Sequence, residues 1–138
     1  MPHLRKALTI AGATLAITAP LMATGSPAFA TARDGVCDGG EFCYYWGLYQ
    51  TDSVSDFNGA VANYGTTQPT CFDFKGSGSG KGECIKNNAM SVWNHSSVAV
   101  RVYFNSNFSG TKYQDIAPFA KVNLNSTLLL NNASHKFL

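Results

Sequence analysis

The chain repeats part of its own sequence, and this repeat limits the folds that are open to it. Asn87-Asn88-Ala89 stands four residues before Trp93, and Asn131-Asn132-Ala133 stands four residues before Phe137, at an offset of 44 residues. A unit of about 40 residues is too small to bury a core alone, so two such units must pack together. The repeat predicts a sandwich of two Greek-key units, with repeat one near residues 36–94 and repeat two near residues 95–138.

A second pair of matching runs lies upstream and indicates that repeat one is the longer unit. Cys43-Tyr44-Tyr45 matches Val102-Tyr103-Phe104 at an offset of 59 residues, which exceeds the first offset by 15. The surplus falls between the two matches, where the low-complexity run 75–82 lies. The Gly and Ser residues of this run predict a flexible insertion, closed at its base by Cys71 and Cys84.

The order of apolar residues predicts strands. Val98, Val100, Val102 and Phe104 occupy alternate positions, the period of two expected of a half-buried strand. No capped run with a helical period follows residue 30, and residues 56–64 could hold at most one turn of helix. The expected fold class is therefore all-β. Further strands are predicted at Phe42–Trp46, Ser91–Asn94 and Lys121–Leu124, with turns at pairs such as Asn58-Gly59 and Ser109-Gly110.

The first thirty residues have the three parts of a secretory signal. Arg5 and Lys6 precede an apolar run, and the small-x-small sequence Ala28-Phe29-Ala30 follows it. Pro20 and Gly25 interrupt the apolar run, so it falls short of the roughly 20 residues of a spanning helix. We expect cleavage after Ala30, a secreted mature protein of residues 31–138 forming a single domain, and no membrane attachment after cleavage.

Cleavage changes the charge of the protein. The whole chain carries ten Lys and Arg against eight Asp and Glu, and loss of Arg5 and Lys6 brings the mature chain to zero. A neutral domain lacks the cationic surface that binds nucleic acid or acidic membranes. We therefore expect neither partner, and we expect a monomer.

All four cysteines lie in the exported part of the chain. Four cysteines allow three connectivities, and their spacing favours Cys37–Cys43 with Cys71–Cys84. A zinc site is disfavoured, because the spacing contains no C-x₂-C pair and an exported protein meets an oxidising compartment. The sequence predicts two local disulfides.

Nothing in the sequence indicates an enzyme. His95 and His135 have no neighbouring motif that would orient a general base. Asp52 and Asp56 are spaced like one turn of a helix, but paired carboxylates need a cleft to act. We predict a protein without catalytic activity and without a cofactor.

A family resemblance emerges from the hairpin and asparagine motifs. Tyr103–Gly110 is similar to the aromatic-x₆-Gly hairpin of βγ-crystallin-type domains, where glycine serves a fold-over with positive φ. Asn87–Ser91 resembles the second signature of those domains. With the signal peptide and the early pair Cys37 and Cys43, the chain from about Gly35 onward resembles peptidase inhibitor family I36, the secreted bacterial inhibitors of the Streptomyces metalloproteinase inhibitor type.

This resemblance implies a βγ-crystallin-like fold and inhibition of an extracellular metalloprotease. In the family, a disulfide of the second repeat holds the reactive loop, whereas repeat two of this chain has no cysteine. The inhibitory residues of the family therefore have no matching positions here. One replacement is the disulfide-closed loop of repeat one, although a Gly/Ser run loses much entropy on binding and favours the reading as an insertion. The residues of this possible protease-contact loop are Lys75, Gly76, Ser77, Gly78, Ser79, Gly80 and Lys81.

The asparagine runs also raise the question of calcium. In βγ-crystallin-type domains such runs supply oxygen ligands to Ca²⁺, which here would come from Asn88, Ala89, Ser91, Asn132 and Ala133. The second run carries His135 at the expected hydroxyl position, with Ser134 one place early, and neither run contains a carboxylate. We therefore expect the runs to serve left-handed turns rather than an ion.

Two other functions remain open. A non-inhibitory secreted structural or surface protein, with weak calcium binding as an additional property, would use the same stapled fold. A carbohydrate-binding module would expose aromatic side chains, but only about half of those in a strand can face solvent. The aromatic residues concerned are Phe42, Tyr44, Tyr45, Trp46 and Tyr49.

Overall fold

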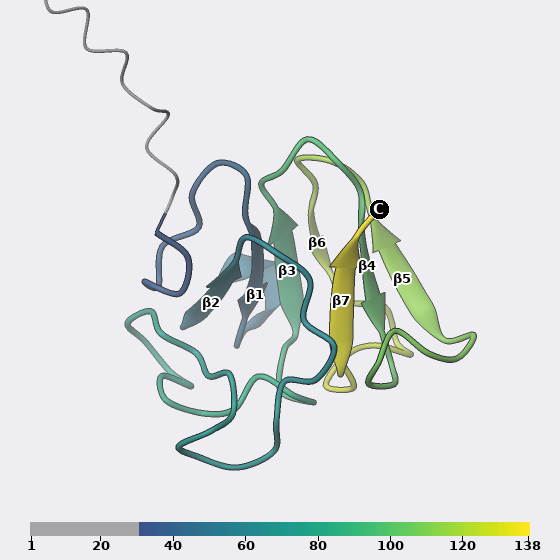
Figure 1. Ribbon diagram of the computed structural model, residues 1–138. Helices are drawn as coiled ribbons and strands as arrows, with labels where there is room; N and C mark the ends of the chain where they lie inside the picture. The colour runs from purple at the N-terminus through teal and green to yellow at the C-terminus, as the bar shows by residue number, and fades with distance from the viewer. Residues whose placement is uncertain (1–30) are drawn as a thin grey trace, which may run out of the picture.

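The computed structural model describes residues 31–138, and the predicted signal peptide 1–30 lies outside the described residues. The described chain forms two antiparallel sheets with the strand orders β2-β1-β3-β6 and β5-β4-β7. Figure 1 shows the first sheet on the left and the second on the right. The elements are β1 (Phe42–Tyr45), the 3₁₀ turn η1 (Leu48–Gln50), β2 (Val54–Phe57), β3 (Ser91–Asn94), β4 (Val100–Tyr103), β5 (Tyr113–Ile116), β6 (Lys121–Asn123) and β7 (Ser134–Phe137).

The predicted alternation is visible in β4. Val100 and Val102 are fully buried, whereas Arg101 between them is half-buried. The strand is shorter than predicted, because Val98 lies before it with 40% of its surface exposed. Alternate burial over four residues is enough to direct one face of this strand to the core.

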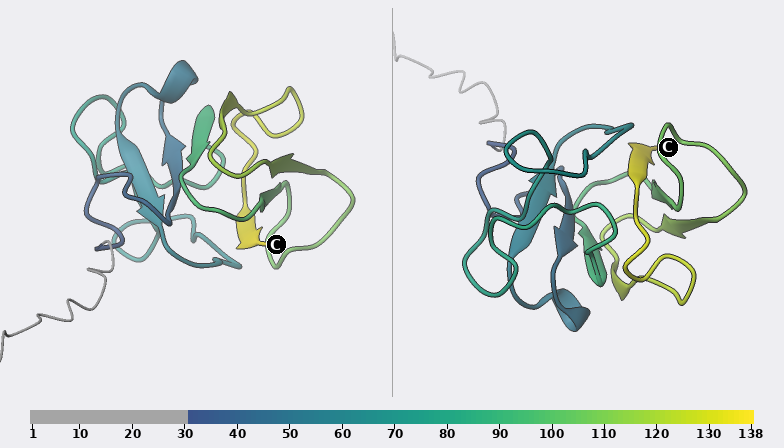
Figure 2. Two further views of the ribbon diagram at one scale, coloured as in Figure 1. Left: turned by 90° about the horizontal axis from the view of Figure 1, so that it is seen from above. Right: turned by 90° about the horizontal axis from the view of Figure 1, so that it is seen from below.

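The two repeats interlock. Strand β6 belongs to repeat two but pairs with β3 of repeat one, with Val122 opposite Val92. In return, Val61 of repeat one forms an antiparallel bridge with His135 in β7. Each repeat therefore completes the sheet of the other, and Figure 2 shows the blue and teal half packed against the green and yellow half.

The register of the strands corrects the repeat alignment by one residue. Tyr45 pairs with Ser91, and Tyr103 pairs with Ser134, so the offsets are 58 and 43 residues rather than 59 and 44. The surplus of 15 residues in repeat one is unchanged. The shared letters Asn-Asn-Ala favoured the wrong match, because the backbone aligns Asn87 with Leu130, both at a positive φ near 60°.

Three strands had no prediction. β2, β5 and β7 are four residues long and contain polar pairs, Ser55-Asp56 in the case of β2. Residues 56–64, for which the sequence allowed at most one turn of helix, contain the end of β2 and the Val61 bridge. Pairing within the sheets therefore outweighs the weak local preference.

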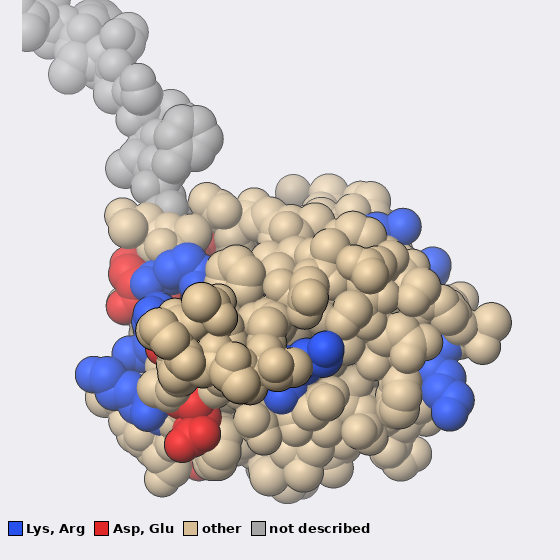
Figure 3. Space-filling model, turned by 60° about the horizontal axis from the view of Figure 1, so that its bottom comes forward, with Lys and Arg blue, Asp and Glu red and all other residues tan. Residues whose placement is uncertain are grey.

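Charge is distributed unevenly between the repeats. Residues 31–94 carry four cations and seven acids, and residues 95–138 carry four cations and one acid, which gives net charges of −3 and +3. On the face shown in Figure 3, the acidic atoms all lie on the left, whereas basic atoms lie across the whole face. The neutral total therefore conceals two oppositely charged halves.

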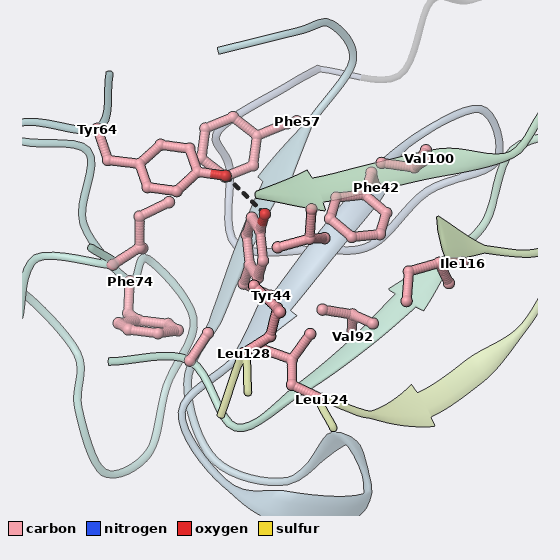
Figure 4. Packing of buried hydrophobic residues seen from close by; sticks show 13 residues of the cluster. Phe42, Tyr44, Phe57, Tyr64, Phe74, Val92, Val100, Ile116, Leu124 and Leu128 are labelled. Atoms are coloured by element: carbon pink, nitrogen blue, oxygen red, sulfur yellow. Dashed lines mark hydrogen bonds between the residues drawn. The ribbon is translucent and has the colours of Figure 1, made fainter. Parts of the chain in front are cut away.

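The core lies between the sheets. Phe42 and Tyr44 of β1 are fully buried, whereas Tyr49 of the same predicted aromatic group is 74% exposed. Figure 4 shows the β1 rings packed with aliphatic side chains from both repeats. Other core residues include Phe57, Tyr64, Phe74, Ile85, Val92, Ile116, Leu124 and Leu128.

A hydrogen-bonded chain of polar groups crosses this core. The hydroxyls of Tyr44 and Tyr64 are 2.6 Å apart, and the Tyr64 hydroxyl lies 2.7 Å from His135 Nδ1. His135 Nε2 lies 2.9 Å from the Gly59 carbonyl. Because a carbonyl can only accept, Nε2 carries the proton, Nδ1 accepts from Tyr64, and Tyr64 accepts from Tyr44. Burial lowers the pKa of His135 to about 4, so the imidazole is neutral near pH 7. His135 is therefore a neutral residue of the core.

The described residues contain no helix of the length and hydrophobicity needed to cross a bilayer.

Both predicted disulfides are present, Cys37–Cys43 with 6.0 Å between Cα atoms and Cys71–Cys84 with 5.7 Å. Each closes a local segment of repeat one.

Candidate functional site

Cys71 and Cys84 close a short hairpin that was not predicted as one. Ile85 N–H donates to the Phe72 carbonyl at 2.9 Å, and Phe74 N–H donates to the Glu83 carbonyl at 3.0 Å. An isolated bridge pairs Asp73 with Cys84 between them. The disulfide and this ladder fix both ends of the 75–82 run.

The run is held against the edge of β2, which corrects the prediction of a flexible insertion. The N–H groups of Lys75 and Gly76 donate to the Val54 carbonyl at 2.8 and 3.0 Å. The Ser53 N–H in turn donates to the Ser79 carbonyl at 3.1 Å. β2 is an edge strand of its sheet, and the loop covers its open hydrogen-bonding groups, a common way of protecting an edge.

Glycine allows this close approach. A Cβ at Gly76 would lie 2.7 Å from Val54 Cγ1, and a Cβ at Gly80 would overlap the Trp46 indole. The absence of side chains therefore lets the backbone lie directly on β2 and on the indole ring. A composition that is typical of flexible linkers serves here as a close-packing surface.

Gly80→Ala should release the loop from Trp46, whereas Gly82→Ala should not. Gly80 has φ +87° and Gly82 has φ +85°, but a Cβ at Gly82 meets nothing within 4 Å. Both variants lose roughly 1 kcal/mol from the positive φ, and only Gly80→Ala adds a clash with the indole. We expect faster proteolysis of the loop and a changed Trp46 fluorescence in Gly80→Ala alone. Equal behaviour of the two variants would contradict the packing described here.

A charged group fixes the base of the loop. Lys75 Nζ lies 2.7 Å from Asp73 Oδ1, and Gln68 Nε2 donates to Asp73 Oδ2 at 3.0 Å. Burial acts to raise the pKa of Asp73, but the hydrogen bonds from Lys75 and Gln68 outweigh it and hold the pKa below its usual value. Arg33 lies 3.6 Å from the same carboxylate and above the Phe57 ring, 4.3 Å from its centroid.

Most of the predicted contact residues are accessible. Gly76 and Gly80, which face β2 and Trp46, are half-buried. The exposed members are Lys75, Ser77, Gly78, Ser79 and Lys81. The loop therefore presents an exposed surface on a fixed backbone, the geometry that a binding loop requires.

The structure brings the two asparagine runs together. Asn87 N–H donates to the Asn132 carbonyl at 2.9 Å, and Ala89 N–H donates to Asn132 Oδ1 at 3.2 Å. Leu130 N–H donates to the Ala89 carbonyl at 3.0 Å. The candidate calcium ligands Asn88, Ala89, Ser91, Asn132 and Ala133 thus lie in adjoining segments.

The serine hydroxyls of the two runs make hydrogen bonds to the protein backbone. Ser91 Oγ donates to the Gly47 carbonyl at 2.6 Å and accepts from Gln50 N–H at 2.9 Å. Ser134, which is in register with Ser91 and not one place early, bonds in the same way to Asn105 and Phe108. Each hydroxyl thus holds the fold-over of a hairpin, and a calcium ion would have to compete with these hydrogen bonds. Within residues 31–138 there is also no cluster of three His, Cys, Asp or Glu residues suited to a metal ion.

The remaining titratable residues weighed in the sequence are separated. Asp52 is exposed, whereas Asp56 is buried and accepts from the N–H groups of Asp34 and Gly35 at 3.1 and 2.8 Å. The His95 ring stacks on Trp93 at 4.0 Å, and His135 lies in the core. These groups do not form a common cluster.

One feature had no signal in the sequence. A pocket of about 160 Å³ lies beside Arg33 and Phe57, smaller than the roughly 300–1,000 Å³ of ordinary ligand sites. Its other lining residues are Ala32, Asn58, Gly59, Ala60, Val61 and Phe72.

Comparison with known proteins yields one family and two solved structures. The model of Inhibitor_I36, described as peptidase inhibitor family I36, matches residues 30–114. A structure reported under "Evolution of the eye lens beta-gamma-crystallin domain fold" has a TM-score of 0.56 at 14% identity, covering 75% of this chain and 93% of that one. The N-terminal domain of protein S has a TM-score of 0.50 at 17% identity, covering 71% and 94%. No curated protein matches. At these identities the structures establish the βγ-crystallin-like fold alone.

Proposed function

This chain belongs to peptidase inhibitor family I36, and on that premise we propose that it is a secreted inhibitor of an extracellular metalloprotease. It would act by binding and covering the protease cleft, without catalysis of its own. The signal-like sequence of residues 1–30 supports secretion. The metalloprotease target rests on the resemblance to the Streptomyces metalloproteinase inhibitor type.

The observation that carries the proposal is the fixed loop between Cys71 and Cys84. Its composition argued against inhibition, because a mobile Gly/Ser segment loses conformational entropy when it binds. The disulfide, the hairpin ladder and the bonds from β2 remove most of that freedom before any protease is met. A preformed exposed loop binds with a smaller entropic penalty, which supports residues 75–81 as the protease contact.

Inhibition assays with the purified oxidised domain test the proposal. We expect tight inhibition of at least one enzyme in a panel of extracellular metalloproteases that includes a thermolysin-like protease, because the loop is preformed. A variant that replaces residues 77–79 by Ala-Ala-Ala should lose inhibition, and a control with Ser126→Ala and Thr127→Ala on the exposed 125–127 turn of repeat two should retain it.

One outcome would contradict the function and another would contradict the contact site. If the wild-type domain inhibited no protease, the proposal would be wrong and a non-inhibitory extracellular structural protein would remain. If the domain inhibited a metalloprotease but the loop variant were equally potent, the family function would stand and residues 77–79 would not be part of the contact. Circular dichroism of each variant ensures that loss of inhibition is not loss of fold.

A further inference from the structure

The loop between the cysteines has a bound part and a free part. Lys75 and Gly76 bond to Val54 at the start of β2, Ser79 bonds to the preceding residue Ser53, and Gly80 packs on Trp46. Lys81, Gly82 and Glu83 follow immediately and are exposed. Both parts therefore offer exposed residues, but only the second makes no hydrogen bond to Ser53 or to β2.

Few side chains in this loop are long enough to fill a protease pocket. The run from Ser77 to Gly80 offers only hydroxymethyl groups and hydrogens. Lys75 is held by Asp73 at 2.7 Å. Glu83 is also exposed, but its backbone pairs with Phe74 in the hairpin ladder, so it lies at the paired base of the hairpin and Lys81 lies in the turn beyond it. Lys81 is exposed, and the hydrogen bonds and ion pairs of the described residues leave its ammonium group unengaged.

The backbone holds Lys81 in place while its side chain is free. Lys81 N–H donates to the Gly78 carbonyl at 3.4 Å, and Glu83 N–H donates to the Gly80 carbonyl at 2.9 Å. Two overlapping turns, residues 78–81 and 80–83, therefore contain the lysine. A fixed backbone with one free cationic side chain is suited to insertion into a pocket that carries a carboxylate.

We infer that Lys81 is the specificity-determining residue of the loop and that the target protease has an acidic specificity pocket. The inference rests on the proposed function and deepens it, because it names the chemistry of the partner's pocket. When one partner of a buried charge pair at an interface is truncated, dissociation is faster and the affinity typically falls by about 30-fold to a few thousand-fold. Lys81→Met keeps the length of the side chain and removes the charge.

Four proteases separate the pocket from the catalytic class. A lysine-directed metalloendopeptidase and a trypsin-like serine protease accept lysine, whereas a thermolysin-like metalloprotease and a chymotrypsin-like serine protease prefer apolar residues. We expect the wild-type domain to inhibit the lysine-directed metalloendopeptidase best. Lys81→Met should weaken that inhibition about 100-fold, and Lys81→Arg should retain most of it.

Lys112→Met is the matched control, because Lys112 is an exposed lysine of repeat two. It should leave inhibition unchanged. Inhibition that changes less than about threefold in Lys81→Met, or that favours the thermolysin-like metalloprotease, would overturn the inference while the proposed function stood. A wild-type domain that inhibits none of the four would overturn both. Thermal unfolding should be the same for all three lysine variants, because neither lysine contributes to the core.

Discussion

Replacing His135 with alanine should lower the free energy of unfolding by roughly 3–5 kcal/mol. The ring is fully buried and packs on Phe42 and Phe57 at centroid distances of 5.3 and 5.0 Å. Its removal leaves a cavity and deprives the Tyr64 hydroxyl of its acceptor. Domains of this size have about 5–15 kcal/mol in total, so the variant should lie near the limit of folding. Urea unfolding followed by near-ultraviolet circular dichroism measures the loss.

Two variants separate the causes of that loss. His135→Phe fills the space but offers Tyr64 no acceptor and the Gly59 carbonyl no donor, so we expect a loss of about 1–3 kcal/mol. His95→Ala is the matched histidine control, because His95 is only half-buried and stacks on Trp93. It should lose less than about 1 kcal/mol. A loss below 1 kcal/mol in His135→Ala would contradict the role of the buried chain.

The stability of the domain should change little between about pH 4.5 and 6.5, because two buried groups have opposite effects there. The pKa of His135 falls from 6.5 to about 4, so the unfolded state binds more protons and stability rises with pH. Burial raises the pKa of Glu41 from 4.5 to about 7, so the native state binds more protons and stability falls with pH. The full His135 shift corresponds to about 3 kcal/mol.

Single variants should expose each slope. With Glu41→Gln, stability should increase from pH 4.5 to 6.5, because the lowered pKa of His135 is then no longer offset by the raised pKa of Glu41. With His135→Phe, stability should decrease over the same range. Chemical unfolding at intervals of half a pH unit measures both slopes. Parallel curves for the two variants would show that these groups do not have the shifted pKa values.

The repeat and the alternation of Val100 and Val102 were enough to predict the fold class. Both features report directly on core packing, since a buried face needs apolar residues at regular intervals. The disulfides followed from spacing in the same way. Strand β7 could not be found like this, because Ser134 and His135 are buried through hydrogen bonds and not through hydrophobicity.

The one-residue error in the repeat has a physical reason as well. Sequence letters aligned Asn87 with Asn131, whereas the backbone aligns the positive φ of Asn87 with that of Leu130. Leucine is a poor residue for this conformation, so nothing in its identity indicates the equivalence. The error carried over to Ser134, whose match with Ser91 becomes clear only from the hairpin bonds.

The candidate loop was the least predictable part. Its position in the chain and its closure by Cys71 and Cys84 followed from the sequence. Its attachment to β2 did not, because the bonds to the Val54 carbonyl and from the Ser53 N–H use backbone groups that carry no sequence signal. A further bond, from Ser53 Oγ to the Gly76 carbonyl, uses a hydroxyl that many loops contain. Glycine gives the same composition to a mobile linker and to a tightly packed one, and only the neighbouring surface, here Trp46, distinguishes them.

The exchange of β6 and Val61 between the sheets has a consequence for how the protein could be divided. A polypeptide cut between residues 94 and 95 would give two fragments, each lacking the strand segment that the other supplies. Neither fragment alone contains all the strand segments of its sheet, but the two fragments together contain the segments of both sheets. The molecule is therefore suited to reassembly from two separately made pieces, joined by pairing rather than by a linker.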